Sequence, residues 1–114
     1  GDGCGSEAAL ARLLAQRGIH CRIVNPTPWP GMFDFLLGED IDEQSARGAA
    51  ALDDVDALVV LDINDVRRLG HLADRVRALT VPISVIDHHV AGDEPVGSLA
   101  VADTRACATG ELVY

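Results

Sequence analysis

The sequence predicts an α/β fold with a parallel sheet, because two apolar segments flank an amphipathic one. Residues 55–62 and 81–86 are nearly continuous apolar runs, which is typical of strands that are covered on both faces. Between them, residues 65–79 carry apolar side chains three and four positions apart, namely Val66, Leu69, Leu72, Val76 and Leu79, which predicts an amphipathic helix. A strand, a helix and a strand in this order predict a βαβ unit with a right-handed crossover.

The elements before this unit follow from composition and from glycine and proline positions. Residues 1–6 form a glycine-rich segment that predicts a turn, with Ser6 as a candidate N-cap for a helix over residues 7–16. Residues 19–25 predict a short strand that is closed by prolines, and residues 33–37 fit either a helical turn or a strand. The acidic residues 39–42 indicate a solvated face, and the alanine-rich residues 43–52 predict a helix.

Two further elements are expected after the βαβ unit. Residues 98–102 predict a short strand that stops at Asp103, and residues 109–114 predict the first turns of another helix. Together, these elements predict a Rossmann-like parallel sheet flanked by helices, in a chain short enough for one domain at most.

Composition limits the classes of function. The chain has 9 Lys and Arg residues, all of them arginine, against 18 Asp and Glu, so its net charge is −9. This balance excludes electrostatic gripping of long nucleic acid, but small phosphorylated substrates stay possible where bound divalent metals invert the local charge. The three cysteines, Cys4, Cys21 and Cys107, lack Cys-x-x-Cys spacing, and no apolar run is long enough to span a membrane. We therefore expect reduced thiols, a cytoplasmic location and no membrane partner.

Metal-binding residue types follow the ends of the predicted strands. Asp62 follows one strand, residues 87–89 (Asp-His-His) follow the next, Asp103 follows the third, and Asp2 precedes the first helix. Carboxyl ends of parallel strands meet at the edge of the sheet where ligands bind. Each aspartate by itself is better explained as a turn or cap residue. Together, carboxylates and an imidazole suit Mn²⁺ or Mg²⁺ better than structural zinc, with Asp62 as the candidate bridge between two ions.

The segment Ile86-Asp87-His88-His89 resembles the signature of the DHH phosphoesterases. Residues 1–6 resemble the end of this family's first motif, His-x-x-Pro-Asp-x-Asp-x-x-x-Ser. Residues 62–70 resemble the second motif, and residues 103–111 resemble the fourth. The four segments stand in the family's order and cover the whole chain.

The resemblance implies a role for each candidate residue. One Mn²⁺ would be held by Asp2, Asp62, His88 and Asp103, with Asp62 bridging to a second Mn²⁺ in the complete site; Mg²⁺ is the alternative ion. Asp87 would orient His88 from behind, as carboxylates do for metal-bound histidines. His89 would face the substrate phosphate and help to neutralise its charge or protonate the leaving group. Arg68 would support the substrate phosphate or the acidic cluster.

The resemblance also implies that residues 1–114 are a DHH domain truncated at both ends. The histidine and aspartate that open the family's first motif, and the strand that carries them, would precede Gly1. The rest of the domain and the C-terminal domain that clamps the substrate would follow Tyr114. We therefore expect negligible activity from this chain alone.

Residues 24–28 and 33–36 resemble the branch of bifunctional oligoribonucleases and 3′,5′-bisphosphate (pAp) nucleotidases. This branch implies a Mn²⁺-dependent hydrolase that acts on very short RNA and on small phosphorylated nucleotides, and it is compatible with a homodimeric full-length protein. Three alternatives stay open: a cyclic dinucleotide phosphodiesterase, a non-catalytic nucleotide-binding DHH-like domain, and a plain flavodoxin-like binding module. Metal dependence separates the last two from an enzyme.

Overall fold

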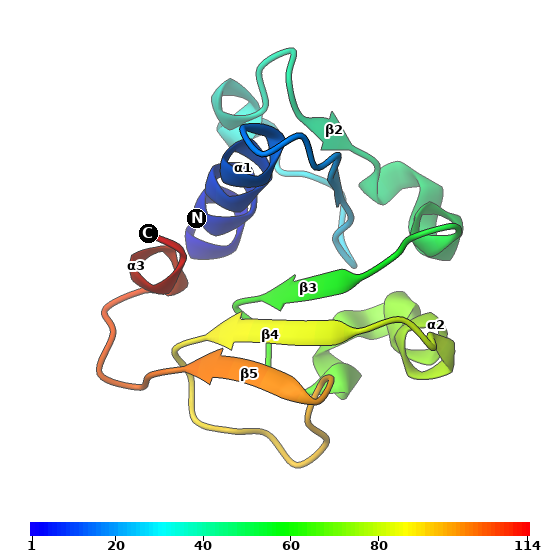
Figure 1. The fold of residues 1–114 in the computed structure, drawn as a ribbon, viewed down its shortest axis with the longest axis vertical. Helices are drawn as coiled ribbons and strands as arrows, with labels where there is room; N and C mark the ends of the chain where they lie inside the picture. Colours follow the sequence, from blue (N-terminus) through cyan, green and yellow to red (C-terminus); the bar gives the residue numbers. More distant parts are fainter.

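The computed structural model describes residues 1–114 and confirms the predicted α/β fold, with parallel strands flanked by helices (Figure 1). The larger sheet has the order β3-β4-β5, with β3 at Leu58–Leu61, β4 at Ile83–Asp87 and β5 at Leu99–Ala102. A smaller sheet pairs β1 (Arg22–Ile23) with β2 (Asp42–Glu43). All of these pairs are parallel.

The register of the larger sheet aligns the carboxyl ends of its strands. Leu61, the last residue of β3, pairs with Ile86, and Asp87, the last residue of β4, pairs with Ala102. The three arrowheads in Figure 1 accordingly point to the same side of the molecule, where the amino terminus and α3 (Thr109–Val113) also lie. Residues that follow β3 and β4 are therefore brought to one edge, as the sequence predicted.

The predicted crossover helix 65–79 is two helices. A 3₁₀ helix, η3 (Val66–Leu72), precedes α2 (Ala73–Ala78), and Gly70 within η3 has φ 56°, a left-handed conformation that breaks a regular helix. The crossover nevertheless buries its apolar face against the sheet as predicted. The core contains Leu52, Val60, Val66, Leu69, Leu72, Ala73, Val76, Val85 and Val96.

The segment 43–52 also differs from the prediction. It forms the short strand β2 and then the 3₁₀ helix η2 (Ser45–Leu52), which is kinked where Gly48 has φ 60°. Another 3₁₀ helix, η1 (Gly31–Leu36), occupies the region that fitted either a turn or a strand. The predicted strands 19–25 and 55–62 are shorter in the structure, at residues 22–23 and 58–61. No helix reaches the length and apolarity required to cross a membrane.

The predicted glycine-rich turn at residues 1–6 is helical. Helix α1 (Asp2–Ala15) begins at Asp2 with Gly1 as its N-cap, so Ser6 is not the N-cap. The buried Ser6 hydroxyl instead donates to Asp2 Oδ1 one turn earlier, at 3.2 Å. Asp2 also accepts hydrogen bonds from the amides of Thr109 and Gly110. These long-range contacts hold the first turn although glycine has a low helix propensity.

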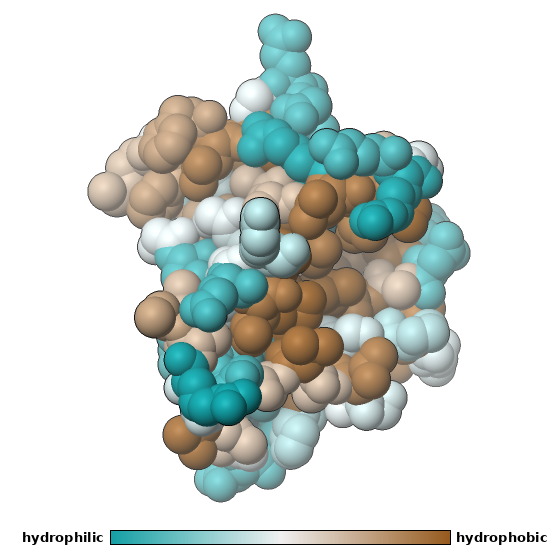
Figure 2. Space-filling view, turned by 60° about the vertical axis from the view of Figure 1, so that its left-hand side comes forward, coloured by the Kyte–Doolittle hydropathy of each residue, from teal (hydrophilic) through white to brown (hydrophobic).

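A mostly apolar groove of about 460 Å³ separates the smaller sheet from β3. Leu10 and Leu14 of α1, Ile23 of β1 and Leu58 and Val60 of β3 contribute to its walls. One face of the molecule accordingly shows an apolar band between hydrophilic regions (Figure 2). The strand β3 has a hydrogen-bonded neighbour only in β4, so its other edge faces this groove.

The turn before β5 gives a stability prediction. Gly97 has φ 68°, and an added Cβ would lie 2.4 Å from the carbonyl oxygen of Ile83 at the start of β4. Gly97→Ala should therefore lower the free energy of unfolding by at least about 2 kcal/mol, through backbone strain and overpacking. The control is Gly18→Ala. Gly18 has a similar φ of 76°, but a Cβ added there would have no atom within 4 Å. Urea unfolding should show a clearly larger loss for Gly97→Ala; equal losses would contradict the predicted clash.

Candidate metal centre

Three elements bring acidic and imidazole groups to the carboxyl edge of the larger sheet. Asp62 follows β3, His88 and His89 follow Asp87 at the end of β4, and Asp2 begins α1. Asp62 has φ 64°, a conformation that few non-glycine residues adopt but that Asp and Asn tolerate. A strained backbone where a strand delivers a carboxylate to such an edge is typical of functional sites.

The ring of His88 is the centre of the group. Its Nε2 lies 3.3 Å from Asp2 Oδ2 and 3.5 Å from Asp62 Oδ1. The Nδ1 of His89 lies 3.7 Å from the same Asp62 oxygen. The side chains of Asp62, Asp87, His88 and His89 offer donor atoms within 4.8 Å of one another, so the group could hold a metal ion.

Hydrogen bonds define which nitrogen of each ring is available. The Nδ1 of His88 lies 3.3 Å from the carbonyl oxygen of Ala106. Because a carbonyl only accepts, Nδ1 carries the hydrogen in this contact, and Nε2 is the nitrogen that would bind a cation in the neutral ring. For His89, Nδ1 lies 2.6 Å from Asp87 Oδ1, so its Nε2 is the free nitrogen.

The structure corrects the partner predicted for Asp87. Its carboxylate contacts the ring of His89 and the backbone amide of His88, at 2.6 and 2.8 Å, whereas the ring of His88 is oriented by Ala106. The reason is local geometry, because the backbone amide of His88 and the ring of His89 both reach the same oxygen, Asp87 Oδ1.

Asp87 provides a test of whether these residues fit a cation. Its side chain is fully buried, and Oδ2 has no hydrogen-bond donor among the protein groups. Oδ1 already accepts from the His88 amide and the His89 ring, whereas the buried Oδ2 lacks a partner, and a nearby positive charge would stabilise it. The carboxylates of Asp62 and Asp87 and the rings of His88 and His89 make a donor set of oxygens and imidazole nitrogens, which fits Mn²⁺ or Mg²⁺.

Asp2 is held in its charged form by the end of the chain. The amides of Thr109 and Gly110 donate to its two oxygens, at 2.9 and 3.2 Å. Burial raises the pKa of Asp2, but these two hydrogen bonds and that from Ser6 outweigh burial, so the pKa lies below its ordinary value. A deprotonated Asp2 beside His88 is the form that a cation requires.

Sequence reasoning missed Thr109. It is fully buried, and its hydroxyl donates to Asp62 Oδ1 at 3.0 Å. Thr109 lies in the motif-like segment 103–111, but a small polar residue at the first position of the predicted last helix is explained equally well as an ordinary helix start.

Two predicted site residues lie outside the group. Asp103 follows β5 as expected, but its oxygens accept from the amide and guanidinium of Arg105, which lower the pKa of Asp103 to about 2. Arg68 is exposed and makes no ion pair. Its neighbour Arg67 pairs instead with the buried Asp65.

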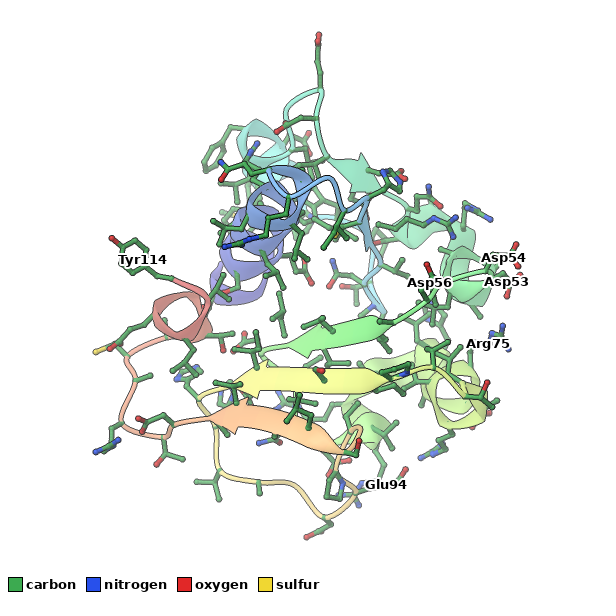
Figure 3. All side chains as sticks on the ribbon, in the orientation of Figure 1. Asp53, Asp54, Asp56, Arg75, Glu94 and Tyr114 are labelled. Carbon is green, nitrogen blue, oxygen red and sulfur yellow. The ribbon has the colours of Figure 1, made fainter.

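A second acidic cluster lies at the opposite end of β3. Figure 3 shows Asp53, Asp54 and Asp56 there, beside Arg75, which pairs with Asp53 at 3.0 Å. All three aspartates are exposed, and no histidine joins them in a group that could hold a metal ion. The candidate site is therefore the carboxyl edge.

The fold and this edge define an α/β protein whose parallel strands deliver carboxylates and imidazoles to one site. The chain is similar in fold to the crystal structure of an exopolyphosphatase-related protein from Bacteroides fragilis, with a TM-score of 0.85 and 23% sequence identity. The similarity covers 99% of this chain and 34% of that protein, so the chain spans about a third of its length. No protein-family model and no curated protein matches the sequence.

Proposed function

We propose that this chain belongs to a DHH-type phosphoesterase that hydrolyses small phosphorylated nucleotides with divalent metal. The observation that carries the proposal is the convergence of Asp2 Oδ2 and Asp62 Oδ1 on His88 Nε2, within 3.3 and 3.5 Å, at the carboxyl edge of a parallel sheet. The similar protein of known structure is named as exopolyphosphatase-related, which supports chemistry on phosphorylated compounds.

The proposed cofactor is Mn²⁺, with Mg²⁺ as the alternative. Asp2, Asp62 and His88 would hold one ion, and Asp103 is the proposed fourth ligand once it exchanges Arg105 for the cation. Paired ions in such a site supply an activated water and neutralise the phosphoryl oxygens during in-line displacement. Asp62 is the proposed bridge to a second ion, on the resemblance to the DHH motifs, and its Oδ1 lies 3.5 Å from His88 Nε2.

His89 is the proposed contact to the substrate phosphate. Its side chain is 41% exposed, against 21% for His88, so His89 is the ring that a substrate reaches more easily. Asp87 holds its Nδ1 and thereby directs Nε2 away from the buried carboxylate. In the imidazolium form, with a second hydrogen on Nε2, the ring could donate a hydrogen bond to a phosphate oxygen or give that proton to the leaving oxygen and return to the neutral ring. Arg68 is exposed and unpaired, and it stays a proposed substrate contact.

The proposed substrates are very short RNA and 3′,5′-bisphosphate nucleotides, on the resemblance of residues 24–28 and 33–36 to that branch. Asn25 of this segment donates to Glu7 of α1 at 3.0 Å, and its backbone amide donates to Ser45 Oγ at 2.8 Å. A cyclic dinucleotide phosphodiesterase is the second candidate, because the same motifs fit it.

We also propose that residues 1–114 are part of a larger DHH domain. The apolar groove between β1 and β3 supports this proposal. The unpaired edge of β3 lines the groove, and the lining is apolar, as a further parallel strand requires. The similar structure is about three times as long as the stretch that matches. Substrate clamping and a homodimer belong to this proposed longer protein.

Hydrolysis assays on the longer polypeptide test the function. With Mn²⁺ present we expect release of phosphate from pAp and of mononucleotides from a diribonucleotide, and loss of both on chelation. Cleavage of cyclic di-adenylate alone would favour the second candidate. Nucleotide binding without hydrolysis of any of the three would contradict an enzyme, and residues 1–114 alone are expected to show negligible turnover.

A further inference from the structure

We propose that Thr109 is a positioning residue of the metal centre, which holds the carboxylates of Asp62 and Asp2 in the arrangement that a cation requires. This inference rests on the proposed function. Thr109 itself is no ligand; it acts on two residues that come from different elements, α1 and the end of β3.

The contact to Asp62 leaves one lone pair of its Oδ1 available to a cation. The Thr109 hydroxyl donates to Asp62 Oδ1 at 3.0 Å, and the same oxygen lies 3.5 Å from His88 Nε2. A carboxylate oxygen can accept two hydrogen bonds, so Thr109 occupies one direction and leaves the other for a cation beside His88. Because a carboxylate offers only lone pairs, the hydroxyl must be the donor in this contact.

The contact to Asp2 comes from the backbone of the same residue. The Thr109 amide donates to Asp2 Oδ2 at 2.9 Å, and that oxygen lies 3.3 Å from His88 Nε2. One buried residue therefore touches both carboxylate oxygens that face His88. A change in the position of α3 would move both ligands together.

The geometry does not fit an ordinary helix-start threonine. The N-cap of α3 is Ala108, which makes no side-chain capping bond, and the first two amides of α3 donate to Asp2 instead. A capping threonine accepts an amide hydrogen from its own helix, whereas Thr109 gives its hydrogen to a residue 47 positions away. Residues behind a metal site commonly orient its ligands by donating hydrogen bonds to them, as Thr109 donates to Asp62. Loss of such a partner lowers metal affinity about 10- to 100-fold.

The test is a Mn²⁺ titration by calorimetry of the 114-residue chain, with Thr109→Val and Thr109→Ser. Valine keeps the shape and the backbone amide but lacks the hydroxyl, and serine keeps the hydroxyl. We expect the Kd for Mn²⁺ to rise about 10- to 100-fold in Thr109→Val and to stay within about threefold in Thr109→Ser. The control is Thr80→Val, at an exposed position before β4, which should leave the Kd unchanged.

Circular dichroism at each titration temperature separates positioning from folding. If Thr109→Val does not fold, the comparison uses Thr109→Ala and Thr109→Ser, which differ by the hydroxyl alone. Equal Kd values with and without the hydroxyl, in folded variants of a chain that binds Mn²⁺, would overturn the role of Thr109 and leave the metal centre standing. No Mn²⁺ binding by the folded wild-type chain would instead overturn the metal centre, and the role of Thr109 with it.

Discussion

Replacement of Asp62 with asparagine should raise the Kd for Mn²⁺ by at least about 100-fold, the loss expected when a charged ligand is removed from a site that depends on it. Asp62 Oδ1 lies within 3.7 Å of both His88 and His89, and Asp62 is the proposed bridge between two ions. Asparagine keeps the volume and tolerates the left-handed φ of 64° at this position, so the backbone should not change. The loss of Mn²⁺ affinity would then measure the contribution of the negative charge of Asp62.

Calorimetric titration of Mn²⁺ into the folded chain provides the measurement, and Asp56→Asn provides the control. Asp56 belongs to the acidic cluster at the other end of β3, is exposed and lies in no group that could hold a metal ion (Figure 3). We expect Asp56→Asn to bind Mn²⁺ like the wild type. Comparable affinity losses in the two variants would show that net negative charge alone attracts the ion, and the predicted site would be wrong.

The strands β3 and β4 could be predicted from sequence because each lies in a nearly continuous apolar run. The apolar runs that became β3 and β4, and the amphipathic segment between them, carry strong periodic signals that survive without tertiary information. The helices inside that crossover could not be predicted in detail, since one glycine, Gly70, adopts a left-handed conformation that the hydrophobic pattern does not reveal. The two-residue strand β2 is equally too short to leave a pattern.

The candidate site could likewise be predicted only in part. Asp62 and His88 could be placed at one edge because each directly follows a predicted parallel strand. The contacts made through α3 could not be foreseen, because Thr109 meets Asp2 across 107 positions of sequence. The same contact explains why α1 begins at Asp2, where local propensity predicted a turn. The pairing of Asp103 with Arg105 depends on a turn geometry that the sequence leaves undetermined.

Glu7 should make the stability of the chain depend on pH. Burial raises the pKa of Glu7 to about 7; the hydrogen bond from Asn25 opposes this, and the negative charges of Glu43 and Asp62 add to it. The ordinary value is 4.5, so between these two pH values the folded chain binds more protons than the unfolded chain. Linkage then requires the free energy of unfolding to fall as the pH rises from 4.5 to about 7, by roughly 3 kcal/mol, and to stay low above that pH.

Urea unfolding between pH 5 and pH 8 tests this with Glu7→Gln. Glutamine keeps an oxygen that can accept from Asn25 and carries no charge, so the variant should be more stable than the wild type at pH 8, by up to roughly 3 kcal/mol, and nearly equal to it at pH 5. Glu39→Gln is the control, because Glu39 is exposed and makes no ion pair. If wild type and Glu7→Gln change in parallel over this range, Glu7 does not titrate there. Because the charge of Asp62 contributes to the raised pKa, bound Mn²⁺ should lower the pKa of Glu7 and thereby reduce the pH dependence, which links this half-buried acid to the candidate metal centre.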